Sequence, residues 1–176
     1  GIASGEVFIA TSLDGFIATP DETLDWLTGQ PDLNLGEHDY RNFIKTISTV
    51  VMGRATYDWI AKYPGEWEYA GKRVIVVTSR PIDTPKGPLE TRSDIASLIA
   101  ELRALDDGDV WMLGGGKLQM AFMERGALDA IEIYVISEII GSGIPLFPPT
   151  GLRASPRLVS AQSFGTACAR LHYRFD

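Results

Sequence analysis

Three consecutive glycines, Gly114, Gly115 and Gly116, stand where a strand pattern gives way to a helix pattern, with Lys117 directly behind them. Residues 109–113 predict a short buried strand, and the apolar positions that follow Lys117 predict a helix. Glycine lets the backbone turn sharply and lets a ligand approach the peptide N–H groups. A helix N-terminus also presents unpaired donors that suit a phosphate. By itself the junction indicates either a phosphate-binding turn or a tight turn without a ligand.

The chain has the size and composition of one globular domain spanning residues 1–176. Hydrophobic residues make up 45% of it and charged residues 22%, and a chain of this length buries about 70% of its unfolded surface. Its single cysteine, Cys168, lies in an alternating apolar stretch and is expected in the core. One cysteine excludes an internal disulfide and a multi-cysteine metal site, and it favours a reducing compartment.

A net charge of −7 argues against a nucleic-acid or membrane-surface binder, because no basic stripe offsets it. No apolar run reaches the ~18 residues that span a bilayer, and the first residues lack the basic start of a signal peptide. We therefore expect a cytoplasmic protein that acts on a small molecule without a metal. If an acidic chain binds a phosphorylated ligand, its few cations must gather in one place.

Strand and helix patterns alternate along most of the chain. Apolar runs predict strands at residues 7–11, 49–53, 73–78, 109–113 and 130–137. Helices are predicted at residues 37–47, 54–61, 93–104 and 118–123, and Ser93 is expected to cap the third. Residues 20–36 predict a long loop, and residues 157–175 a β-hairpin. The pattern indicates an α/β fold with a mixed, mostly parallel central sheet flanked by helices and a C-terminal antiparallel hairpin.

Three predicted strand ends carry side chains that bind phosphate. The first is followed by Arg54 and Thr56, the second by Ser79 and Arg80, and the third by the glycines and Lys117. In an open parallel sheet, ligands bind at the carboxyl ends of the strands. Each residue alone is also explained as a surface cation or a helix cap. Together they predict a polyphosphate site.

The order of these motifs resembles that of dihydrofolate reductase-like proteins. The matching segments are residues 9–10 (Ile-Ala), 13–18 (Leu-Asp-Gly-Phe-Ile-Ala), 50–57 (Val-Val-Met-Gly-Arg-Ala-Thr-Tyr), 77–80 (Val-Thr-Ser-Arg) and 113–117 (Leu-Gly-Gly-Gly-Lys). Within that superfamily, residues 141–147 (Gly-Ser-Gly-Ile-Pro-Leu-Phe) look most like the reductase domain of riboflavin biosynthesis and its stand-alone relatives. The resemblance implies an NADPH-dependent reductase and a cis peptide bond between two of the glycines.

The resemblance also implies a set of cofactor contacts. Arg54 and Thr56 would meet the phosphates, residues 78–80 the adenosine 2′-phosphate, and residues 114–117 the pyrophosphate, while Ala10 and Ile17 would lie near the nicotinamide. The full set of expected cofactor residues is Ala10, Ile17, Gly53, Arg54, Thr56, Thr78, Ser79, Arg80, Leu113, Gly114, Gly115, Gly116 and Lys117.

On the substrate side, the resemblance implies an acidic residue on the first long helix, with an aromatic residue one turn later. Asp39 and Phe43 have that spacing, whereas an ungapped match selects Glu37. We prefer Asp39 as the catalytic acid, with Glu37 second, because Asp39 and Phe43 would share a helix face. Trp26 resembles the tryptophan of the family's active-site loop. The alternative is that Asp39 only stabilises the N-terminus of the helix through the helix dipole.

Two departures count against a folate substrate. Lys72 replaces the arginine that holds the glutamate tail of folate, and Ile136 replaces a threonine expected beside the substrate acid. A reductase of the 5-amino-6-(5-phosphoribosylamino)uracil type is therefore preferred. The alternatives are a divergent dihydrofolate reductase, an NADPH-binding protein without catalysis and a purely structural domain. Relatives of this kind often form homodimers. The zinc deaminase set of bifunctional relatives is missing from this chain.

Overall fold

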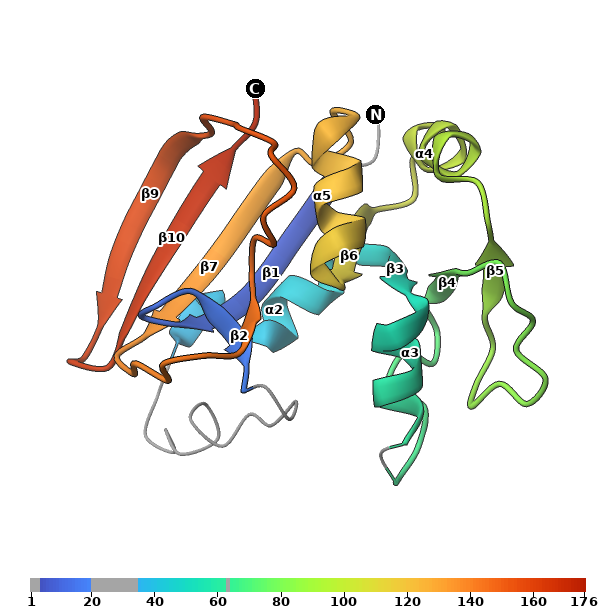
Figure 1. Cartoon of the computed structure of the whole chain (residues 1–176), viewed down its shortest axis with the longest axis horizontal. Coiled ribbons are helices and arrows are strands. Elements are labelled where there is room, and N and C mark those ends of the chain that lie inside the picture. Colours follow the sequence, from blue (N-terminus) through green and yellow to red (C-terminus); the bar gives the residue numbers. More distant parts are fainter. Residues whose placement is uncertain (1–3, 20–34, 63) are drawn as a thin grey trace.

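The computed structural model describes residues 4–19, 35–62 and 64–176 (Figure 1). The strands are β1 (Gly5–Ser12), β2 (Phe16–Ala18), β3 (Ile47–Gly53), β4 (Arg73–Val77), β5 (Glu90–Arg92), β6 (Asp109–Gly114), β7 (Ala130–Ile136), β8 (Ile144–Pro145), β9 (Arg157–Phe164) and β10 (Cys168–Arg174). The helices are the 3₁₀ turn η1 (Gly36–His38), α2 (Tyr40–Lys45), α3 (Arg54–Ala61), α4 (Ile95–Arg103) and α5 (Gly116–Glu124).

Eight strands form the central sheet in the order β5-β4-β3-β6-β1-β7-β10-β9. The pairs from β5 to β7 are parallel, and β10 is antiparallel to both β7 and β9. The hairpin of β9 and β10 forms one side of the sheet in Figure 1, and β5 forms the other. The expected α/β fold, with a mostly parallel sheet and a C-terminal antiparallel hairpin, is confirmed.

The core has two layers because successive side chains of a strand point to opposite faces of the sheet. In β3, Val51 packs with α4 and α5, whereas Val50 and Met52 pack with α2 and α3. In β4, Ile75 belongs to the first layer and its two neighbours to the second. Continuous apolar runs are typical of parallel strands that are covered on both faces.

The first predicted helix is shorter than its pattern indicates. Instead of one helix over residues 37–47, the chain forms η1 and then α2, and Ile47 already belongs to β3. Asp39 has an extended backbone and its carboxylate accepts a hydrogen bond from the Arg41 N–H, so it caps α2 from outside. The expected common helix face of Asp39 and Phe43 is therefore wrong.

The third predicted helix also begins later than expected. α4 starts at Ile95, and its cap is Asp94 rather than Ser93, because the Asp94 carboxylate accepts from the Ala96 N–H. None of the helices in the described ranges is long and apolar enough to cross a membrane.

A buried arginine ties the hairpin to the sheet. The Arg170 side chain on β10 hydrogen-bonds to Glu132 on β7 and to Ser160 and Gln162 on β9. Only 5% of Arg170 is exposed. Its charge is compensated by Glu132, which also accepts a hydrogen bond from the Tyr134 hydroxyl.

Candidate active site

Strand register brings the three strand ends that are predicted to bind phosphate to one edge of the sheet. Gly53 at the end of β3 lies opposite Val77 at the end of β4. Met52 lies opposite Gly114 at the end of β6. Each of these ends leads into the segment that carries the predicted cations. The sequence-based expectation that these cations gather at one edge agrees with this arrangement.

The glycine turn links β6 directly to α5. Gly114 ends the strand, Gly115 is the N-cap of the helix, and the peptide bond between them is cis. Gly114 has φ = +131°, a conformation that side chains with Cβ rarely adopt. A Cβ on Gly116 would lie 2.9 Å from Pro148 Cδ, so this position also requires glycine.

Arg54 connects the start of α3 to the segment after β4. Its Nε donates to Asp58 Oδ1 at 3.0 Å, and its Nη1 donates to the carbonyl oxygens of Arg80 at 3.0 Å and Pro81 at 3.3 Å. The Arg80 N–H donates to Thr78 Oγ1 at 3.1 Å. Arg54 therefore places a positive charge at the edge and also fixes the loop that presents Arg80.

A hollow of about 420 Å³ opens beside this edge. We call it the edge hollow, and its described lining is Ile9, Ala10, Ile17, Ala18, Ala55, Thr56, Trp59, Ile60, Glu68, Tyr69, Leu113, Gly114, Gly115, Gly116, Gln119, Ile144 and Leu146. Seven of the predicted cofactor residues belong to this lining: Ala10, Ile17, Thr56, Leu113, Gly114, Gly115 and Gly116.

The other predicted cofactor residues lie at the strand ends without lining the hollow. Gly53 ends β3 and Arg54 begins α3, whereas residues 78–80 follow β4. The side chains of Arg80 and Lys117 are exposed. The structure brings the two groups together at adjoining strand ends, which a dinucleotide longer than the hollow could span.

The predicted substrate-side residues lie elsewhere. Asp39 and Phe43 line a different hollow, and the Phe43 ring stacks on Phe8 with a centroid distance of 4.3 Å. Glu37 belongs to η1, and its side chain is not described. Trp26 lies outside the described residues. The catalytic role of Asp39 or Glu37 stays a prediction, as does the substrate contact of Trp26 and Phe43.

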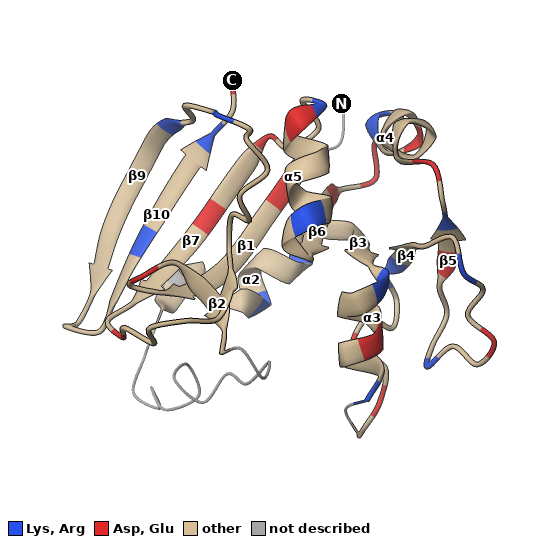
Figure 2. Ribbon diagram, in the orientation of Figure 1, with Lys and Arg blue, Asp and Glu red and all other residues tan. Residues whose placement is uncertain are grey.

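This second hollow, about 260 Å³ in volume, is acidic, and we call it the acidic hollow. Its carboxylates are those of Glu6, Asp39, Asp109 and Glu132. Burial, together with the nearby charge of Asp109, raises the pKa of Glu6 from 4.5 to about 7. Figure 2 shows acidic positions on β1 and β7, next to a basic position on β10.

Ten lining residues of the edge hollow were not predicted to contribute to a site. Four of them are polar or aromatic: Trp59, Glu68, Tyr69 and Gln119. Gln119 is 3% exposed, and its Nε2 lies 3.4 Å from the Leu146 carbonyl oxygen. The signal that would have identified Gln119 is a polar residue three positions after the glycine turn, at the start of a helix. No local signal marks Glu68 and Tyr69.

Lys72 does not provide a cation to the edge hollow. Its Nζ donates to the carbonyl oxygens of Ile44 at 2.9 Å and Ile47 at 2.6 Å. Lys72 therefore closes the C-terminal end of α2 and joins it to β4. This contact agrees with the sequence argument that a folate tail lacks its usual partner here.

Comparison with known proteins identifies relatives along nearly the whole chain. Residues 5–169 match the family model described as the RibD C-terminal domain. The uncharacterized protein YwjB of Bacillus subtilis is 33% identical over 171 residues, which cover 95% of both chains. The riboflavin biosynthesis protein RibD of Corynebacterium ammoniagenes is 28% identical over 149 residues, which cover 77% of this chain and 43% of RibD.

Solved structures agree in fold. A Shewanella sp. PV-4 protein assigned to riboflavin biosynthesis superposes with a TM-score of 0.86 at 26% identity and covers 98% of this chain and 99% of its own. Dihydrofolate reductase from Enterococcus faecalis, complexed with NADP(H), superposes with a TM-score of 0.63 at 20% identity, covering 97% of this chain and 95% of its own, which shows the shared fold. The expected resemblance is confirmed: this chain belongs to the RibD C-terminal domain family and has the dihydrofolate reductase-like fold.

Proposed function

We propose that the protein is an NADPH-dependent reductase of the riboflavin-biosynthesis type. One observation carries the proposal: the two α-helices that begin at the phosphate edge, α3 and α5, have glycine N-caps and no side-chain cap. The other two described α-helices, α2 and α4, are capped by aspartate side chains. The uncapped N–H groups at the edge therefore suit the phosphates of a ligand.

The residues at the edge fit NADPH by their chemistry. Gly114 and Gly115 present backbone without side chains, and Thr56 contributes a hydroxyl beside them. The exposed guanidinium of Arg80 and the ammonium of Lys117 supply charge for phosphate groups. The cofactor bound in the Enterococcus faecalis structure is NADP(H), on the same fold. These features support a phosphorylated nicotinamide cofactor.

Bound at this edge, NADPH would supply a hydride to an electrophilic carbon of the substrate, such as an imine-type carbon of an opened ribose. The chain's own part is orientation and exclusion of water. Ala10 and Ile17 line the hollow where the nicotinamide is expected, and Ile9, Leu113 and Ile144 add apolar walls. Burial raises the pKa of Tyr69 far above neutrality, so its hydroxyl keeps its proton and remains a donor.

The preferred substrate is of the 5-amino-6-(5-phosphoribosylamino)uracil type, a pyrimidine related to pterins. RibD proteins of this family contribute to riboflavin biosynthesis, as the Corynebacterium ammoniagenes relative is named. The position of Lys72 adds to the case against folate, because its Nζ is held by two backbone carbonyls.

The test is NADPH oxidation by purified protein with this pyrimidine or with dihydrofolate, together with NADPH binding measured by thermal shift. We expect binding, and turnover of the pyrimidine. Turnover of dihydrofolate alone would assign a divergent dihydrofolate reductase. Tight NADPH binding without turnover of either compound would indicate a non-catalytic binding protein, and no thermal shift would contradict the cofactor site.

A further inference from the structure

The edge hollow has an unusual charge content for a site beside a phosphate edge. Of its described lining residues, Glu68 is the only one of an acidic or basic type. The remaining lining is apolar, glycine or uncharged polar, the last represented by Thr56, Tyr69 and Gln119. A single carboxylate without a lining cation favours ligand groups that donate hydrogen bonds or carry positive charge.

The position of Glu68 is set by its neighbour Tyr69. Tyr69 is 4% exposed, and its ring packs edge-on against Trp67 at 5.4 Å and Trp111 at 6.3 Å between centroids. The Tyr69 hydroxyl and the Glu68 carboxylate share a hydrogen bond. A buried aromatic residue therefore anchors the backbone beside Glu68 and holds part of its carboxylate, which leaves further acceptor positions for a ligand.

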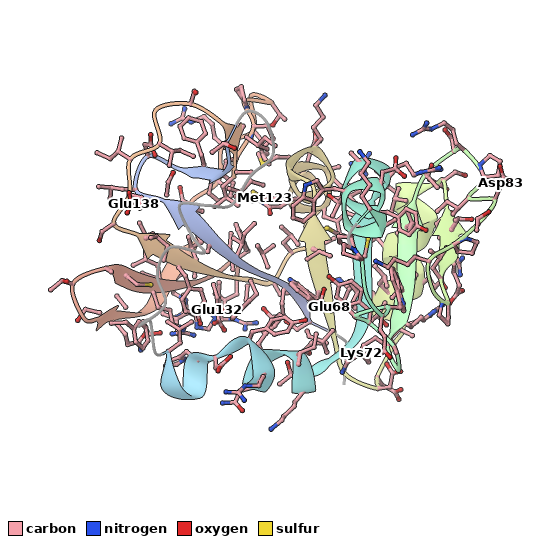
Figure 3. All side chains as sticks on the ribbon, turned by 90° about the horizontal axis from the view of Figure 1, so that it is seen from below. Glu68, Lys72, Asp83, Met123, Glu132 and Glu138 are labelled. Carbon is pink, nitrogen blue, oxygen red and sulfur yellow. The ribbon has the colours of Figure 1, made fainter. Side chains whose placement is uncertain are left out.

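Figure 3 shows Glu68 apart from Glu132, a carboxylate of the acidic hollow. Glu68 lies on the side of β3 and β4, whereas Glu132 lies on the side of β7 and the hairpin. Glu132 is already bonded to Arg170 and Tyr134. Glu68 is thus the carboxylate that faces the space next to the cofactor edge.

The described segments next to Glu68 supply no cation to balance its carboxylate. Residues 1–40, which supply β1 and β2 to the wall of the edge hollow, contain eight aspartates and glutamates and no lysine or arginine. Lys72, in the same loop as Glu68, is held by the carbonyls of Ile44 and Ile47. An anionic ligand group placed beside Glu68 would meet a carboxylate and no cation from the described lining.

We propose that Glu68 selects the substrate of this hollow: it binds a ring that presents an amino group or a protonated nitrogen, and it rejects anionic groups at that position. The inference rests on the proposed reductase function and narrows its substrate class. A phosphate or carboxylate of the substrate must lie outside the edge hollow. The 5-amino group of an aminouracil fits the proposed role of Glu68 as an acceptor.

A charge series of small rings tests the proposal without turnover. Benzamidinium, benzamide and benzoate have nearly the same shape and carry a positive, zero and negative charge. We would titrate each into ¹⁵N-labelled protein, with and without NADP⁺, and follow the amides of Tyr69 and residues 114–116 by NMR. We expect benzamidinium to bind at least tenfold more tightly than benzoate, a difference of about 1.4 kcal/mol.

Two matched variants assign the preference to one side chain. Glu68→Gln should lower the affinity for benzamidinium to that for benzamide. Glu66→Gln removes the same charge from an exposed position of the same loop that does not line the hollow, and it should preserve the preference.

The proposal is overturned if benzoate binds as tightly as benzamidinium, if Glu68→Gln keeps the preference, or if no probe shifts these amides. A failure of the reductase proposal gives a different result, because NADP⁺ would then leave the amides of residues 114–116 unshifted while the charge preference persisted.

Discussion

The edge hollow and the acidic hollow both border β1, yet they handle carboxylates in opposite ways. In the acidic hollow, four carboxylates gather, one of them bonded to the buried Arg170 and another, Glu6, with a pKa near 7. In the edge hollow, one described carboxylate, Glu68, faces an apolar wall. The difference teaches that the number of acidic residues does not locate a site. A carboxylate that the fold has already compensated is less suited to a ligand than a single accessible one.

The largest effect on stability is expected from removing the Arg170–Glu132 ion pair beside the acidic hollow. Arg170→Met leaves the half-buried Glu132 without its partner. Losing one member of a buried ion pair costs about 3–5 kcal/mol of unfolding free energy, and we expect a loss toward the lower end of that range. Urea denaturation measures the loss, and NADPH affinity should stay unchanged. Arg157→Met is the control, because the Arg157–Asp176 pair on the same hairpin is more than half exposed and its removal should have little effect. Equal losses of unfolding free energy in the two variants would contradict a stabilising role of the Arg170–Glu132 pair.

The next effect concerns Glu6 and depends on pH. Its pKa is raised in the folded state, so its protonation favours folding, and this contribution is lost as pH rises from 4.5 through about 7. A pKa difference of one unit corresponds to about 1.4 kcal/mol, so the unfolding free energy should fall by about 3 kcal/mol over this pH range. Glu6→Gln should therefore stabilise the protein at pH 8 and flatten the pH dependence of its unfolding free energy.

The charged groups that act on Glu6 are Asp109, Glu132 and Arg174. Burial lowers the pKa of His172, so its contribution to the unfolding free energy runs in the opposite direction and grows as pH rises. The difference between wild type and Glu6→Gln isolates Glu6, and Glu124→Gln, at an exposed position of α5, controls for net charge. An unchanged pH profile in Glu6→Gln would refute the prediction.

At the edge, Arg80→Ala should weaken NADPH binding by about tenfold, or about 1.4 kcal/mol, and NADH binding much less. The reason is that the Arg80 guanidinium is expected to meet the 2′-phosphate, which NADH lacks. Fluorescence titration with both cofactors measures the effect. Arg153→Ala, at an exposed loop position, serves as the control. Equal weakening of both cofactors would remove Arg80 from the 2′-phosphate site.

The smallest effect is expected from Asp39→Ala. Because the Asp39 carboxylate accepts from the Arg41 N–H, its loss should lower the melting temperature by a few degrees. The kcat/KM for the reductase substrate should change by no more than about twofold, since Asp39 does not line the edge hollow. A loss of about a hundredfold in kcat/KM would instead support the predicted role of Asp39 as the substrate-side acid.

The fold and the alignment of the three strand ends could be predicted because their signals are local. Residues 109–117 carry a strand, a turn and a helix start in one short segment, and the structure reproduces that order. The same holds for Arg54, whose position after β3 follows from an apolar run that ends in Gly53. Register in a parallel sheet then aligns the strand ends without further information.

The substrate side could not be predicted because it depends on contacts between distant residues. Glu68 reaches the edge hollow from the loop before β4. Trp67 in that loop packs closely on Gly87, which follows β4: a Cβ on Gly87 would lie 2.2 Å from Trp67 Cγ. Asp39 was assigned to a helix because the apolar stripe continued past its true ends. In the folded protein, Ile47 belongs to β3 and Asp39 is the N-cap of α2.

The uneven distribution of cations along the chain has an evolutionary consequence. The candidate phosphate-binding side chains all come from Arg54 onward, whereas residues 1–40 hold no lysine or arginine. Mutations in the loop that bears Glu68 are thus expected to change the proposed substrate preference without altering the candidate phosphate-binding side chains. A family built this way can diversify its chemistry by altering one wall at a time.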